Sequence, residues 1–355
     1  MHMARAGILK MRATPSLAPR LRPFAHLGAI LLLALLAYSP HAAPQKQSPS
    51  KAKSSARIDL RPKLVPGQVR RYQVELQTIT NTKSSGVVSD PQGPSRLAVT
   101  WDATIRLEVL GVAFAPGAET NPLVGPLRLR TTYEHSAAAV RSDSPDPQAE
   151  NIEQNYKRLE GQVIEFTVAT DGHVSDVRGL EGVIDDDQVR KAAEQWMAQV
   201  SGPAIAADGV AVGQSWNSAQ PADSMPIAGM IWRSNSTYLR NEPCRPAESA
   251  PSDSPGEICA VILTRQSIFP RKQLRDPTPD DYRRNGLRTS GRWSGSGESL
   301  SYISLETHAA ISVTQDSAQQ IDFTVTNSSG KSIRYAGTIE THSRVALLRP
   351  VPDSH

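Results

Sequence analysis

The sequence predicts a mainly β protein, β-rich α+β in class, in which antiparallel sheets form two related β units with a few covering helices. Apolar and polar residues alternate with period two through most of the chain body, as in half-buried strands. Helical spacing is confined to a few short stretches. The alternation favours antiparallel sheets, because strands of parallel sheets are buried on both faces and read as continuous apolar runs.

The alternation is clearest at residues 97–109, where odd positions are apolar or small and most even positions are polar. Residues 71–77, 127–139 and 164–168 show the same pattern, and further strand-like segments occur at 230–239 and 258–268. In the segment 127–139, His135 falls on the apolar parity, which predicts a core histidine.

Three helices are expected. Residues 185–200 place Val189, Ala193, Trp196 and Val200 on one side, within a connecting segment at 181–208, and Trp196 should anchor that helix on a sheet. Shorter helices are expected at 152–159 and 279–286.

Residues 1–43 are typical of a Sec-type export signal. They carry five basic residues and no acidic one, followed by an apolar run at 27–38 and small residues up to Ala43. We expect cleavage near Ala42 or Ala43, a periplasmic or secreted protein and no stable membrane span afterwards, since no later apolar run reaches the length of a spanning helix. An uncleaved signal anchor is the alternative.

Residues 44–57 form a basic Ser/Pro/Lys linker that lacks apolar residues to bury and is expected to be disordered. Contact with an anionic surface is its alternative role. From Ile58 onward, 30 basic residues face 35 acidic ones, so nucleic acid is not an expected partner.

The body divides into a first β unit at 58–180 and a second at 209–350. Pro66-Gly67-Gln68 opens the first and Val212-Gly213-Gln214 the second, which suggests a duplication. Chance similarity between alternating strands is the alternative. Cys244 and Cys259 flank a Pro/Ser-rich loop, and in an exported protein this arrangement predicts a disulfide.

No catalytic, cofactor-binding or metal-binding motif is recognised, so a non-enzymatic role without cofactors is expected. Two acid–histidine pairs, Glu306 with His308 and Glu340 with His342, could each share a strand face and form a metal or acid/base site. A solvated face with incidental ion pairs is the other interpretation.

Trp216, Trp232 and Trp293 are the candidate ligand-lining residues, because exported β proteins often stack sugars on aromatic faces. Burial in a core is the alternative for all three.

The entries Gly67-Gln-Val-Arg-Arg-Tyr72 and Gly161-Gln-Val-Ile-Glu-Phe166 resemble those of exported bacterial β-rich proteins of unknown function with a duplicated β unit. Some of these look like curved sheets that hold lipid, as lipoprotein carriers do. This resemblance is a fold-level analogy only. The leading expectation is a non-enzymatic cell-envelope protein whose β units bind an apolar ligand or another envelope protein. A structural or adhesive module and a hydrolase with an unrecognised site are the alternatives.

The disulfide is directly testable. We expect denatured, unreduced protein from the periplasm to show no free thiol, because Cys244 and Cys259 are the chain's only cysteines. Titration of two free thiols would contradict both the pairing and the oxidising location.

Overall fold

The computed structural model describes residues 57–60, 64–86, 96–112, 126–144, 146, 149–169, 174–184, 190, 209–222, 225–244, 257–271 and 274–348. The predicted export signal and the linker up to residue 56 lie outside these ranges. So does the predicted helix at 185–200 apart from residue 190, and with it Trp196.

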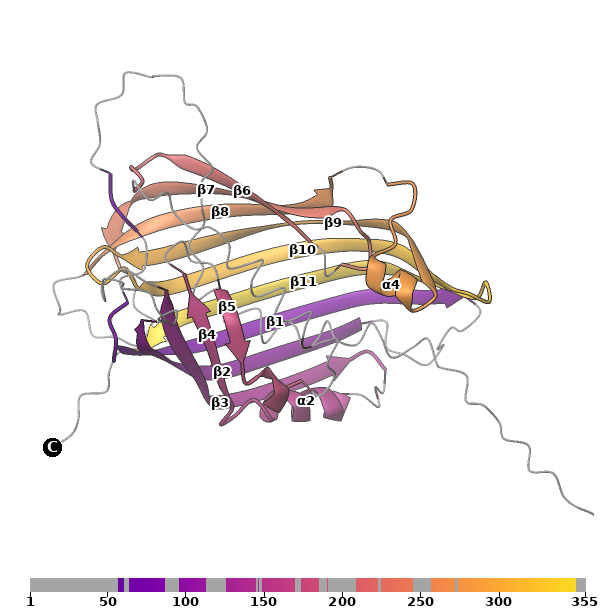
Figure 1. The fold of residues 1–355 in the computed structure, drawn as a ribbon, viewed down its shortest axis with the longest axis horizontal. Helices are drawn as coiled ribbons and strands as arrows, with labels where there is room; N and C mark the ends of the chain where they lie inside the picture. The colour runs from indigo at the N-terminus through magenta and orange to yellow at the C-terminus, as the bar shows by residue number, and fades with distance from the viewer. Residues whose placement is uncertain are drawn as a thin grey trace, which may run out of the picture.

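Eleven antiparallel strands form one continuous sheet, which confirms the predicted mainly β class (Figure 1). The strands are β1 (Val69–Gly86), β2 (Arg96–Val112), β3 (Leu127–Ser142), β4 (Val163–Val168), β5 (Val174–Arg178), β6 (Ser215–Pro221), β7 (Met230–Pro243), β8 (Ile258–Pro270), β9 (Leu287–Ser304), β10 (Ala310–Asn327) and β11 (Ser332–Leu348).

The strand order is β5-β4-β3-β2-β1-β11-β10-β9-β8-β7-β6. Each half of the chain is therefore a simple meander, and the halves join where β1 pairs with β11. The predicted units at 58–180 and 209–350 fall on either side of this seam. The two edge strands, β5 and β6, follow each other in the chain.

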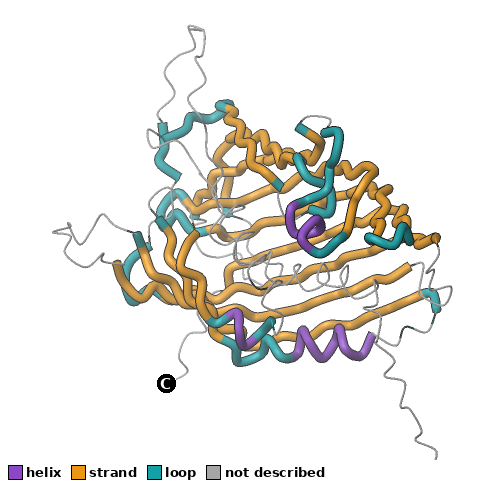
Figure 2. Tube along the Cα trace, turned by 45° about the vertical axis from the view of Figure 1, so that its right-hand side comes forward, coloured by secondary structure: helices purple, strands orange, loops and turns teal. Residues whose placement is uncertain are grey.

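The sheet curves so that β4 and β5 lie in front of β1 to β3, on the same side as helices α2 (Ala149–Lys157) and α4 (Asp280–Arg284) (Figures 1 and 2). We call this side the inner face and the opposite side the outer face. The helices match those predicted at 152–159 and 279–286. A short 3-10 helix, η2 (Leu180–Gly182), follows β5.

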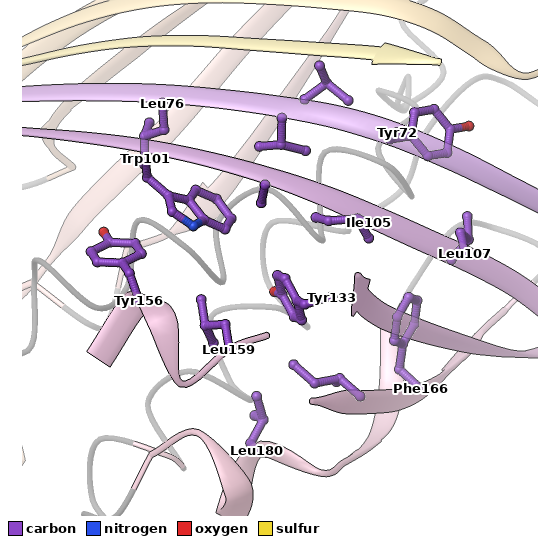
Figure 3. Packing of buried hydrophobic residues seen from close by; sticks show 14 of the residues in the cluster. Tyr72, Leu76, Trp101, Ile105, Leu107, Tyr133, Tyr156, Leu159, Phe166 and Leu180 are labelled. Carbon is purple, nitrogen blue, oxygen red and sulfur yellow. The ribbon is translucent and has the colours of Figure 1, made fainter. Parts of the chain in front are cut away.

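The main core fills the inner face of the first half (Figure 3). Alternate residues of β1 to β4 pack there against Tyr156 of α2, Leu159 and Leu180, and the buried members of the cluster are at most 8% exposed. Trp101 is central: its ring centroid lies 5.6 Å from that of Tyr156, and its Nε1 donates to Ser136 Oγ at 2.9 Å.

Three Gly-Gln turns introduce strands in the same way. Gly67, Gly161 and Gly213 have φ between 81° and 82°, which glycine adopts without steric cost. In each turn the glycine N–H donates to a carbonyl of the neighbouring strand, namely that of Val109, Tyr133 or Tyr238. Because the turn also occurs before β4, inside the first unit, it marks strand entry and not only the start of a unit.

The prediction that His135 lies in the core is wrong. A bulge at Glu134 shifts the register, so that Thr104 faces His135 while Ile105 faces Tyr133. The His135 side chain is 49% exposed, with Nδ1 3.3 Å from a Glu160 carboxylate oxygen, and Ser136 takes the inner position.

We predict that Trp101→Ala lowers the free energy of unfolding by about 3–5 kcal/mol, because it leaves a cavity in a filled core. Thr100→Ala, one residue away on the outer face, should change it by no more than about 0.5 kcal/mol. Denaturant titration of both variants tests this. Equal small effects would mean that the inner face of the first half is not a packed core.

Candidate ligand-binding face

The charged side chains of the sheet are segregated on one face. In the ten strands other than the short β5, the register places every charged side chain except Arg70, at the start of β1, on the outer face. Outer-face ion pairs include Arg334–Asp322 and Arg265–Glu298, each at 2.7 Å. Hydrogen bonds from Arg130 and then Arg128 hold the pKa of Glu165 below its usual value.

The inner face has two different halves. In the first half its side chains form the filled core described above. In the second half apolar residues gather near the two ends of the strands. One cluster includes Met230, Ile268, Trp293, Ile321 and Phe323. The other includes Leu60, Val210, Trp216, Tyr238, Ile262 and Ile303.

Between these clusters runs a strip of uncharged polar residues, which we call the neutral belt. Its two rows follow from the strand register and contain only hydroxyl or amide side chains and one glycine. The first row is Ser343, Gln315, Ser299, Thr264 and Ser236, and the second is Thr78, Thr341, Ser317, Gly297, Gln266, Ser234 and Ser218.

The belt changes character along its length. Over β6, β7 and β8 its hydroxyls pair with one another: Ser218 and Ser234 share a hydrogen bond of 2.6 Å, and Ser236 and Thr264 share one of 2.8 Å. Over β1, β11, β10 and β9 none of the belt side chains bonds to another residue in the described part of the chain. Gln315 Oε1 is buried there without a partner.

The three candidate tryptophans all lie on the inner face: Trp216 at the end of the first belt row, Trp232 in the row next to the second, and Trp293 one row farther from the belt. Trp216 and Trp293 are 3% and 5% exposed, and Trp232 is partly buried. Trp293 Nε1 donates to Gln319 Oε1 at 2.8 Å, next to the belt. Trp216 lies opposite Ser236 in the first row, and its buried Nε1 has no partner within the described residues.

The acid–histidine pairs lie elsewhere. Glu340 and His342 do share the outer face, but His342 Nδ1 is 2.5 Å from Asp316 Oδ1 across the strand pair. Glu306 and His308 lie in the turn between β9 and β10 and not on a strand, and His308 has a φ of 53°. Among the described residues no three His, Cys, Asp or Glu side chains are grouped as metal ligands.

A depression of about 590 Å³ lies over the middle of β3, β2, β1 and β11. Of its twelve lining residues, eight have outer-face parity, including Glu75, Asp102, His342 and Arg344. The depression is therefore bordered by charged groups, and none of the candidate tryptophans lines it.

The predicted cysteine pair is joined, with its Sγ atoms 2.06 Å apart. Cys259 is fully buried in a small cluster with Val261 and Tyr302. The disulfide therefore ties the β7–β8 connection to packed side chains.

Sequence analysis missed the belt, because its Ser, Thr and Gln residues are about as polar as the outer-face residues between them. No alternation in hydropathy therefore marks these stretches as strands with an inner face. The available signal was the absence of charge at alternate positions of 313–321 and 293–301. Hydroxyl-rich strands of this kind become a surface only when their register is known.

No helix within the described residues is long and apolar enough to cross a membrane. In comparisons with known proteins, no protein-family model matches the chain and no curated protein matches its sequence.

Proposed function

We propose that the chain is an exported, non-enzymatic cell-envelope protein that binds an uncharged ligand on its inner face. The supporting observation is the separation of charge: ten strands place all but one of their charged residues on the outer face. Desolvating a charge without a partner is expensive, so a sheet face with a single charged residue suits a ligand that carries no charge.

The apolar ligand expected from the sequence fits only part of this face. The first half is occupied by its own side chains, from Tyr72 to Leu180, and leaves an acyl chain no place without rearrangement. The second half combines apolar clusters with hydrogen-bonding groups, which favours a ligand with both kinds of surface.

A structural or adhesive module is the second candidate, favoured by the filled core of the first half. A hydrolase would need acid and histidine groups gathered in a cleft, whereas His135 of β3 pairs with Glu160 in the turn after α2, and Asp316 of β10 pairs with His342 of β11, each with a half-exposed histidine.

The test compares uncharged probes with charged relatives. The mature chain is titrated with pyrene and with neutral trisaccharides (maltotriose, cellotriose and the trimer of N-acetylglucosamine), and separately with pyrenesulfonate and trigalacturonate. We expect at least one uncharged class to bind more tightly than its charged relative. Ser317→Asp, which puts a charge on the inner face, should weaken that binding at least about tenfold.

Ala318→Asp is the matched control, because Ala318 is the next residue of β10 and is exposed on the outer face. Circular dichroism should show that both variants fold. Absence of binding by every uncharged probe, or equal loss in the two variants, would contradict the proposal and favour the structural module.

A further inference from the structure

We infer that the part of the neutral belt over β1, β11, β10 and β9 binds an uncharged saccharide. This rests on the proposed function and names its ligand class. Its central residues are Thr78, Thr341, Ser343, Gln315, Ser317 and Ser299, which adjoin one another through the register of four neighbouring strands.

The first argument is the hydrogen-bonding state of these groups. They are partly or largely buried, yet none of their side chains bonds to another described residue, whereas the hydroxyls farther along the belt bond to each other. Polar groups in folded proteins are normally satisfied by the protein or by water, so a row of neighbouring donors and acceptors without protein partners suits a ligand that supplies both. Sugar hydroxyls do so, and acyl chains do not.

The second argument is Gln315. Its Oε1 is buried without a donor in the middle of the first row, between Ser343 and Ser299. An acceptor left unpaired in this way costs free energy. A turn of the amide that brings Oε1 to a ligand hydroxyl removes this cost.

The third argument is the border of the belt. Trp293, in the apolar cluster beside the belt, donates from Nε1 to Gln319, two residues beyond Ser317 on β10, and the partly buried Trp232 lies two residues beyond Ser234 on β7. Aromatic rings next to hydrogen-bonding groups suit a sugar ring, whose C–H faces are apolar and whose edge carries hydroxyls. From Thr78 to Ser299 the belt spans three strand spacings, about 14 Å, so a short oligosaccharide and not a single sugar should be the ligand.

A free saccharide chain fits better than the headgroup of a glycolipid. Next to the belt, Leu76 faces Ser343 across the β1–β11 seam, and the side chains beyond Leu76 are packed in the core. A lipid tail attached to a bound sugar would have to displace that packing.

The experiment titrates the mature chain with the three neutral trisaccharides, their monosaccharides, octyl glucoside below its micelle concentration, and pyrene. We expect one trisaccharide to bind more tightly than its monosaccharide and than octyl glucoside. Gln315→Met removes the amide without adding charge and should weaken trisaccharide binding at least about tenfold while leaving any pyrene binding within twofold.

Gln320→Met is the matched control, because Gln320 lies on the same strand with its side chain exposed on the outer face. If Gln315→Met fails to fold, Ser317→Ala takes its place, with Ser296→Ala on the outer face as its control. Pyrene binding without saccharide binding would overturn this inference and leave the proposed function standing. Tighter binding of octyl glucoside would overturn it in favour of a glycolipid, and binding of neither class would overturn both.

Discussion

The architecture depends on the pairing of β1 with β11. From Arg71 to Gly86 the first strand of the sheet pairs residue by residue with the last, and this seam turns two meanders into one surface. Without it, both strands would present a long unpaired edge, which is a hazard for aggregation. The seam also sets the register between the halves, so it decides which side chains of the first unit meet which of the second.

That register explains why the inner face changes character where it does. Leu76 lies between Trp101 on one side and Ser343 on the other, so the apolar row of the first half continues as hydroxyls and an amide in the second. A slip of one residue would turn every side chain of a strand to the other face. Charges such as Glu75 and Arg344, which now face each other outside, would then enter the core. Burial of the first half therefore fixes the register that exposes the belt of the second.

The sequence was informative where one face of a strand is apolar and the other polar. Residues 97–109 and 164–168 belong to strands that match that pattern, and the helices near 152–159 and 279–286 were also found. The long strands β9, β10 and β11 were less visible, because the middle of their inner face carries Ser, Thr, Gln and Gly in place of apolar residues. The feature that obscured these strands is the one that forms the candidate site.

Other features depend on tertiary context. The bulge at Glu134, which moves His135 to the surface, has no signal in the alternation pattern. The candidate tryptophans were identified one at a time, whereas their shared position on the inner face, around one belt, follows from strands far apart in sequence. That the side chains of Thr341 and Ser317 have no hydrogen-bond partner among the described residues can be seen only once all their neighbours are placed.

Hydroxyl-radical footprinting with and without a bound neutral trisaccharide tests the central claim, that the ligand lies on the inner face of the second half. Trp232 and Ile339 lie in the inner-face row next to the belt, while Phe269 lies on the outer face beneath the Arg233 guanidinium, which is 4.8 Å from its ring centroid. We predict that the ligand lowers oxidation of Ile339 and Trp232 and leaves Phe269 unchanged. Protection of Phe269, with Ile339 and Trp232 unaffected, would place the ligand on the charged face and contradict the account.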